Sequence, residues 1–421
     1  MPIDIEHGYA EVEALLREVD LPRGALVRQR IETPPALTDI GAAVKAALKA
    51  VQLPVGTVGV AVGSRGIAQI AEIVAALVRE LRAGGAQPFI FPAMGSHGAS
   101  TAEGQARVLA HLGIDEASVG APIRATMDTV ETGVTDDGVK VFMDANAYAA
   151  DAVVIVNRVK PHTAFRGPVE SGPTKMLAIG LGKQRGAHTV HAAGWAKIHE
   201  TIPKAAAVNI ATGKIAFALA IVENAHEAPS WIEAIPAADL LRREPPLLEQ
   251  AKRNLARLPF SSLDVLVIDR IGKNISGDGA DPNVTGRFPT AYGGAGPQIT
   301  RVVVCDVTNE TQGNANGVGM ADVITHRLAE RFIPPATYMN ALTSTTPEPT
   351  RLPMVMPTCE LALKAALLMC AGIDPQRAQI VRILDTLHLE ELWISESLLE
   401  RARTAGMDVG ATVDAFPMPA W

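Results

Sequence analysis

"TVGVAVGSRGIAQIAEIVAALVRELRAGGAQPFIF", residues 57–91, is the stretch that decides the fold. Its first six residues form an apolar run typical of a buried strand. Residues 67–85 then place apolar side chains at helical spacing and end at a pair of glycines. A second apolar run, 88–91, follows as another strand. Strand, helix and strand in this order predict a βαβ unit, and with it a parallel sheet in an α/β fold.

The chain of 421 residues is too long for one ordinary core, which predicts two domains. The Pro- and Ser-containing stretch "ARLPFSSLD", 256–264, interrupts the regular pattern. We therefore expect an N-terminal α/β domain over 1–258 and a C-terminal α/β domain over 259–421, facing each other across an active-site cleft. Further strands are expected at 152–157, 264–269 and 301–306, and helices at 203–222, 237–257, 318–331, 359–371 and 395–405.

Composition excludes several classes of protein. The net charge is -7 and aromatic residues make up 4%, which argues against a nucleic-acid surface. No apolar run reaches the roughly 18 residues of a membrane span, and the acidic start lacks the pattern of a signal peptide. Three cysteines without a CxxC pair do not form a disulfide framework. We expect a cytoplasmic protein that acts on a small molecule.

Unusual loops follow the predicted strands, where ligands of open parallel sheets bind. "GSRG", 63–66, combines a helix start with Arg65 and suits an anion, although a plain turn with a surface arginine is an equal alternative. "PAMGSHGAS", 92–100, presents His97 between Gly95 and Gly98, as a general base would be presented. The alternative is a solvated loop histidine.

The loop 159–175, "VKPHTAFRGPVESGPTK", is cationic and stiffened by prolines. It carries Lys160, His162, Arg166, Glu170 and Lys175. Such a loop suits an anionic ligand, and a lysine with a neutral amine can form a covalent bond to one. An exposed basic loop, with Arg166 paired to Glu170, is the alternative.

Two further segments are candidates for binding. His188 and His191 share one helix face and could reach a metal, although no CxxC or HExxH motif accompanies them. The second-domain loop 272–287 lacks the final Glu of a calcium loop and is interpreted as substrate-binding. Its candidate side chains are Lys273, Asn274, Asp278, Asp281, Asn283 and Arg287.

The order of these motifs resembles the nickel-pincer lactate racemase family over most of the chain. "GSHG" (95–98), "KPHT" (160–163) and "GPTK" (172–175) are the residues that carry the resemblance. It implies two catalytic histidines, His97 and His162. It also implies a pyridinium-3,5-bisthiocarboxylic acid mononucleotide joined to Lys175, with nickel bound by the histidine sixteen residues later, His191. Arg65, Ser64, Gly95 and Gly172 are the other cofactor-binding candidates.

The resemblance implies a racemase or epimerase, an isomerase of 2-hydroxy carboxylic acids that works by hydride transfer. One histidine would take the hydroxyl proton and the other would return a proton on the opposite face. Arg65, Lys273 and Asn274 would hold the substrate. Lys160, Arg166 and Lys183 would face the nucleotide phosphate or offset substrate charge. Val62 replaces an acidic residue of the family pattern, and the second-domain loop departs from the lactate-binding pattern. The alternatives are a cofactor-less protein that binds an organic acid or phosphate, and a metal-dependent lyase or hydrolase that uses His188 and His191.

Overall fold

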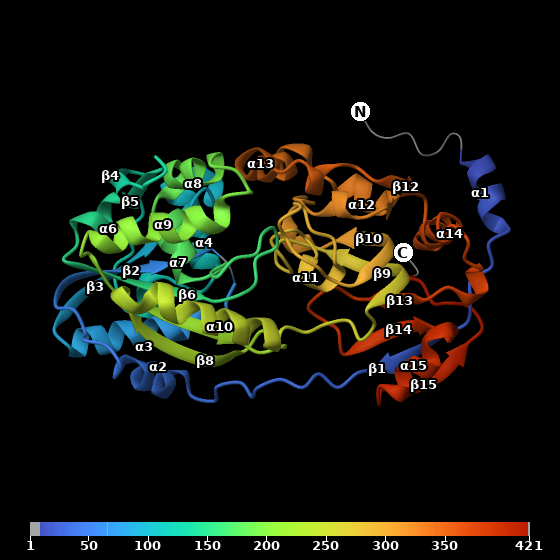
Figure 1. The fold of residues 1–421 in the computed structure, drawn as a ribbon, viewed down its shortest axis with the longest axis horizontal. Helices are drawn as coiled ribbons and strands as arrows, with labels where there is room; N and C mark the ends of the chain where they lie inside the picture. Colours follow the sequence, from blue (N-terminus) through green and yellow to red (C-terminus); the bar gives the residue numbers. More distant parts are fainter. Residues whose placement is uncertain (1–8, 65, 420–421) are drawn as a thin grey trace. The chain divides into compact units, whose positions relative to one another are not determined.

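The structure is a computed structural model that describes residues 9–64 and 66–419. The chain forms two compact units (Figure 1). One unit is Thr33–Leu255, and the other combines the segment that ends at Glu32 with the chain from Ala256 onward. Within the described part of the chain, no helix has the length and apolar character needed to cross a membrane.

The unit Thr33–Leu255 is built on a five-stranded sheet with the order β3-β2-β6-β7-β8. The first four strands of that order are parallel, and β8 pairs antiparallel with β7. Its strands are β2 (Gly56–Val62), β3 (Ala86–Pro92), β6 (Ala152–Arg158), β7 (Ile215–Glu223) and β8 (Pro229–Pro236), with a separate hairpin of β4 (Thr129–Val134) and β5 (Lys140–Asp144). The predicted βαβ unit is confirmed as β2, α3 (Ile70–Ala83) and β3.

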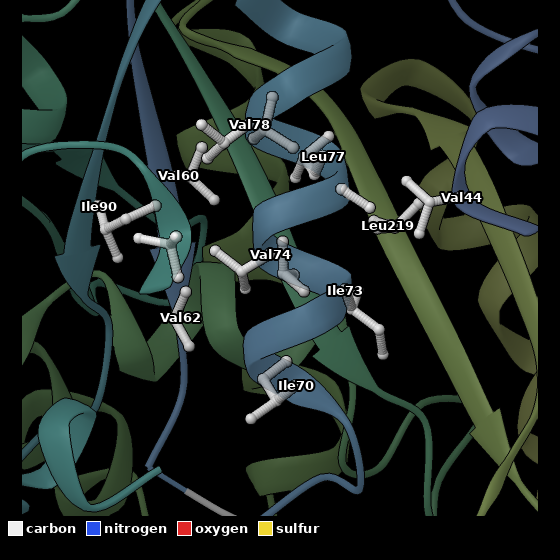
Figure 2. Packing of buried hydrophobic residues seen from close by; sticks show 14 of the residues in the cluster. Val44, Val60, Val62, Ile70, Ile73, Val74, Leu77, Val78, Ile90 and Leu219 are labelled. Carbon is white, nitrogen blue, oxygen red and sulfur yellow. The ribbon is translucent and has the colours of Figure 1, made fainter. Parts of the chain in front are cut away.

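Helices cover both faces of this sheet. On one face, Ile70, Val74 and Leu77 of α3 pack against β2 residues such as Val60 and Val62, as Figure 2 shows. On the other face, a second cluster joins the sheet to the segment after Lys175 and to α9 and α10. Besides α3, the helices are α2 (Ile40–Leu48), α4 (Ala102–His111), α5 (Glu116–Val119), α6 (Ala145–Ala149), α7 (Pro173–Lys175), α8 (Lys183–Ala192), α9 (Ile198–Ala211) and α10 (Leu240–Asn254).

The other unit contains an eight-stranded mixed sheet with the order β12-β11-β10-β9-β13-β14-β1-β15. The strands from β12 to β13 are parallel, and β14, β1 and β15 continue the sheet antiparallel. Its strands are β1 (Gly24–Arg28), β9 (Ser262–Ile271), β10 (Gln298–Val307), β11 (Val323–Thr325), β12 (Met354–Met356), β13 (Ile380–Ile383), β14 (Glu391–Ser395) and β15 (Asp408–Val413). Its helices are α1 (Ala10–Arg17), α11 (Pro282–Thr285), α12 (His326–Arg331), α13 (Pro334–Ser344), α14 (Cys359–Leu368) and α15 (Leu399–Thr404).

The expected helix over 203–222 is wrong in its second half. The helix α9 ends at Ala211, and Gly213, at a φ of 73°, turns the chain into strand β7. The run "IAFALAIVE" is buried on both faces because helices cover the sheet on both sides. In a short, continuous apolar run, the periodicity of the sequence is the same for a buried strand and for a buried helix, so the two cannot be told apart from it.

Two other segments differ from expectation. Strand β1, from the segment expected in the first domain, lies between β14 and β15 of the other unit's sheet. The expected helix over 318–331 is interrupted by β11, and only α12, from His326, is α-helical. Both strands are held by pairing with distant parts of the chain, a signal that local patterns do not contain.

Candidate functional site

Three parallel strands end at one edge of the Thr33–Leu255 sheet, and each leads into a loop singled out in the sequence. In the register of the sheet, Val62 at the end of β2 pairs with Pro92 of β3 and with Val156 of β6. The loops that follow these strands therefore start side by side. His97 belongs to the loop after β3, and His162 belongs to the loop after β6.

His97 is exposed, and its backbone surroundings determine its ring tautomer. Its Nδ1 lies 2.8 Å from the carbonyl oxygen of Met94 and 3.1 Å from Oγ of Ser64. A carbonyl only accepts, so Nδ1 carries the hydrogen and the neutral ring has its lone pair on Nε2. Gly95 and Gly98, with φ of 59° and 64°, supply the left-handed turn. His97 can therefore act as a base through Nε2.

His162 is half-buried and faces Lys175. Its backbone N–H donates to Oε2 of Glu170 at 2.7 Å, and its Nδ1 accepts the backbone N–H of Ala164 at 3.0 Å. The other ring nitrogen, Nε2, lies 2.5 Å from Nζ of Lys175. The ring also packs against that of Phe165 in a tilted arrangement, with 4.4 Å between the ring centroids. The structure thus brings one predicted catalytic histidine into contact with the predicted cofactor lysine.

The other cations of this loop are bound by protein groups. Nη1 of Arg166 donates to the carbonyl oxygens of His162 and Phe165 at 2.6 and 3.0 Å, and lies 3.2 Å from Oε2 of Glu170. Nζ of Lys160 lies 3.6 Å from a carboxylate oxygen of Glu227. The salt bridge between Arg166 and Glu170, which the sequence left as an alternative, is confirmed.

Glu170 connects the histidine loop to helix α10. Its side chain is fully buried, and Nζ of Lys252 lies 3.0 Å from its Oε1. Together with Arg166 and the N–H of His162, this lysine surrounds the carboxylate with donors. A carboxylate can be buried in this way where hydrogen bonds and cations offset the cost of removing it from water, and here Oε2 accepts the hydrogen bonds while Oε1 pairs in charge with Lys252. Glu170 is therefore a structural anchor for the loop that presents His162.

Lys175 ends the short helix α7 and is followed by a π-helical turn, Met176–Gly180. Turns of this kind occur frequently at functional sites. The loop of His97 packs directly on the turn, because the N–H of Gly95 donates to the carbonyl of Gly180 at 3.4 Å. A Cβ on Gly180 would lie only 2.6 Å from the carbonyl oxygen of Ala93. Close backbone packing therefore joins the Lys175 segment to the His97 loop.

The buried carboxyl group of Glu244 contacts Thr174, the residue before Lys175. Its Oε2 accepts the backbone N–H and the hydroxyl of Thr174 at 2.8 and 2.6 Å. Its Oε1 has no hydrogen-bond partner among the described residues, and a Cβ on Gly172 would overlap with it. Burial raises the pKa of Glu244 from 4.5 to about 7, and the Thr174 bonds offset only part of that effect. Gly172 is required by this close packing, and its expected role in cofactor binding stays a prediction.

Replacing Glu244 by glutamine is expected to change how stability depends on pH. The pKa of this carboxyl is raised in the folded state, so the folded chain binds more protons than the unfolded chain between pH 4.5 and about 7. The free energy of unfolding that depends on this carboxyl is highest below about pH 4.5, where the group is neutral in both states. It falls by about 3 kcal/mol as the pH rises through about 7. Denaturant titrations of both proteins at pH 5 and pH 8 should show this loss in the wild type and not in Glu244→Gln. An identical pH dependence in the two proteins would contradict the assignment.

His191 lies on α8, one turn after His188, as expected from the sequence. Its Nδ1 donates to the carbonyl of Ala187 at 2.8 Å, which leaves the lone pair of the neutral ring on Nε2. Burial, together with the charge of Lys175 when present, lowers the pKa of His191 to about 4. Trp195 stands beside both His191 and His162, with ring centroids 5.7 and 6.2 Å away. His191 is therefore a neutral imidazole at physiological pH, in the neighbourhood of Lys175.

Lys183 departs from what the sequence suggested. It was expected to face a nucleotide phosphate or to offset substrate charge, together with Lys160 and Arg166. Its side chain is fully buried instead, and its Nζ pairs with Oδ2 of Asp144 at 2.8 Å. A cation that faces the interior contributes to the framework of the site rather than to ligand binding.

The remaining candidates fall outside this cluster. Arg65 lies outside the residues that the structure describes, and Ser64 contacts His97. Lys273 and Asn274 belong to the other unit, where Nζ of Lys273 donates to the carbonyl of Gly277 at 2.5 Å and Oδ1 of Asn274 accepts the hydroxyl of Thr308 at 2.6 Å. Their substrate-binding role stays a prediction.

Acidic residues of the same loop have structural partners. Asp281 caps helix α11, because its Oδ1 accepts the backbone N–H of Asn283 at 2.9 Å and the side-chain amide at 2.8 Å. Asp278 accepts the side-chain amide of Asn316 at 3.0 Å. Asp278, Asp281 and Asn283 thus all have hydrogen-bond partners within the protein.

Near Lys175, His191 is suited to act as a single protein ligand to a metal that a cofactor also binds. Among residues 9–64 and 66–419, no group of three histidine, cysteine, aspartate or glutamate side chains could hold a metal ion. A pincer nucleotide of the kind that the family resemblance implies brings its own donors and needs one further imidazole. His191 is neutral, with its second ring nitrogen oriented by a backbone carbonyl, as metal-binding histidines are.

Sequence reasoning missed Trp195 and Glu244, and it left the role of Glu170 open. Trp195 carried a usable signal, since it is an aromatic residue only four positions after His191, and the two rings are in contact in the structure. Glu244 carried none, because its partner Thr174 is 70 residues away in the sequence.

Comparisons with known proteins agree with the fold. A family described as a domain of unknown function, DUF362, matches residues 61–238, while no curated protein matches the sequence. The lactate racemase apoprotein from Thermoanaerobacterium thermosaccharolyticum is similar with a TM-score of 0.52 and 13% identity, over 88% of this chain and 99% of that chain. A protein from Thermotoga maritima has a TM-score of 0.46 and 15% identity, over 63% and 69% of the two chains. The chain thus has an α/β fold like that of the lactate racemase apoprotein.

Proposed function

We propose that this protein is a racemase or epimerase of a 2-hydroxy carboxylic acid that uses a nickel-pincer nucleotide. The observation that carries the proposal is the meeting of three sequence-predicted residues in one half-buried cluster. Nζ of Lys175 lies 2.5 Å from Nε2 of His162, and His162 and His191 flank the same tryptophan. The lactate racemase-like fold supports the same reaction class.

The hydrogen bonds around His162 support a nucleophilic role for Lys175. The N–H of Ala164 is a donor, so Nδ1 of His162 must accept, and the neutral ring then carries its hydrogen on Nε2. That hydrogen points to Nζ of Lys175, which can accept it only as an uncharged amine. An uncharged lysine amine is the form that makes covalent bonds to carbonyl-type carbon. The site therefore favours the form of Lys175 that cofactor attachment requires.

The cluster divides into holding and proton-transferring groups. Lys175 would tether the nucleotide, and Nε2 of His191 would bind the nickel. When bound, the cofactor supplies reversible acceptance of hydride from C2 of the substrate. His97, whose Nε2 carries a lone pair, would exchange the hydroxyl proton from one face of the substrate. Once Lys175 is bonded to the nucleotide and no longer accepts the Nε2 hydrogen, His162 would exchange the hydroxyl proton from the opposite face. Arg65 is the proposed carboxylate partner.

Racemisation in deuterium oxide tests the reaction class. The holoprotein, purified from cells that make the cofactor, is incubated with single enantiomers of a panel of 2-hydroxy acids. We expect the opposite enantiomer to form with hydrogen retained at C2, because a hydride does not exchange with solvent. Chiral chromatography with mass spectrometry measures both quantities. Deuterium at C2 would indicate proton abstraction from carbon and would contradict the proposal.

A further inference from the structure

A buried lysine connects helix α8 to the loop of His97. Lys183 begins α8 with a left-handed backbone, φ 53°, and its side chain is fully buried. Its Nζ has three acceptors, namely Oδ2 of Asp144 at 2.8 Å, Oε1 of Gln105 at 3.2 Å and the carbonyl oxygen of Pro92. The ammonium group therefore donates hydrogen bonds to Gln105 and Pro92 and forms an ion pair with Asp144, all inside the protein.

The ammonium group determines which way the amide of Gln105 points. Gln105 lies on α4 and is fully buried. Because an ammonium group only donates, the oxygen of the amide must face Lys183. Nε2 of Gln105 then faces the opposite way, and it donates to the carbonyls of Gly95 at 2.9 Å and His97 at 3.3 Å.

These two carbonyls belong to the turn that presents His97. Within the same turn, the carbonyl of Met94 accepts the Nδ1 hydrogen of His97. The turn also lies tightly against α4, since a Cβ on Gly98 would be 2.5 Å from the backbone nitrogen of Gln105. A continuous chain of hydrogen bonds thus runs from Lys183 through Gln105 to the backbone that orients the imidazole.

We infer that Lys183 is a positioning residue for His97, acting through Gln105. A buried ion pair such as Lys183–Asp144 often stabilises a fold no more than apolar residues of similar volume would. Fold stability alone therefore does not explain the bond from Lys183 to Gln105. Orientation of the Gln105 amide does explain it, and it makes the tautomer of His97 depend on a side chain at the start of α8. The inference rests on the proposed function for the role of His97 as a base, whereas the positioning itself is a property of the apoprotein.

The test uses full-length apoprotein labelled with ¹⁵N in the histidine rings. NMR reports the tautomer of His97, and a His97→Gln sample assigns its signal. Hydrogen exchange measured by mass spectrometry follows the amides of residues 93–101. Gln105→Met keeps the Lys183–Asp144 pair and removes the link to the turn. Lys183→Met removes the cation, and Lys183→Met/Asp144→Asn is the companion variant if the unpaired carboxylate prevents folding.

We expect each variant to speed amide exchange in the turn by about tenfold or more and to mix the two tautomers of His97. Strand β7 should exchange as in the wild type. Lys214→Met is the matched control, because Nζ of Lys214 also donates to a backbone carbonyl, that of Ala150 at 2.9 Å, and should leave His97 unchanged. Folded Gln105→Met and Lys183 variants with wild-type His97 signals and wild-type exchange would overturn the inference. Because no cofactor or activity is involved, failure of the racemase assay would not affect this result.

Discussion

Lys175→Arg protein, produced in cells that make the cofactor, is expected to contain neither nucleotide nor nickel and to show no racemisation. The guanidinium group keeps the positive charge but does not act as an amine nucleophile, so the covalent link cannot form. Because the cofactor performs the difficult step, the loss of activity should be about 10⁴-fold or more. Turnover by chiral chromatography and nickel by elemental analysis give the two readouts.

Lys204→Arg is the matched control for this replacement. Lys204 lies on α9 of the same unit and pairs with Asp136 and Asp137. It should keep both the nickel content and the activity of the wild type. Full activity in Lys175→Arg would exclude a covalent role for Lys175. A modest loss of activity would point instead to a site in which this lysine only contributes charge.

Replacing His97 by alanine should lower turnover by about 10²- to 10⁴-fold, the usual contribution of a general base. The loss should be equal in both directions of a racemisation. The two enantiomers have the same free energy, so the equilibrium constant is 1 and the two kcat/KM values must stay equal. Added imidazole should restore part of the activity of His97→Ala, since His97 is exposed and its site can admit a small base. Initial rates from each pure enantiomer measure the effect.

His111→Ala is the control for the histidine experiment. His111 is exposed at the end of α4, so its loss should change the rate by no more than about twofold. Nickel content should remain at the wild-type level in His97→Ala, because His97 is assigned to proton transfer and not to the metal. A His97→Ala protein that loses nickel together with activity would contradict this division of roles.

The fold of residues 57–91 is predictable from the sequence because each element there carries its own signal. The helix α3 has a clear apolar face, and the strands around it are short apolar runs. The location of His97 and His162 after parallel strands follows from the same patterns. By contrast, β7 and β1 depend on the strands beside them, so their state is decided by partners far along the chain.

The same limit applies to the site. Lys183 carries the charge of a surface or ligand-binding residue, and only the structure shows that Asp144 and Gln105 enclose it. His162 and Lys175 are thirteen residues apart in the sequence. They come into contact because the loop between them folds back, with the N–H of His162 bonded to the carboxylate of Glu170. The expected cleft between two domains, and the roles of Arg65, Lys273 and Asn274, stay predictions.

Intact mass and nickel content, measured on protein from cells that make the pincer nucleotide, test the central claim most directly. We predict a mass increase equal to one nucleotide, located on Lys175 by peptide mapping, and close to one nickel per chain. The same preparation of Lys175→Arg should have neither. An unmodified chain without nickel, isolated from those competent cells, would contradict the account.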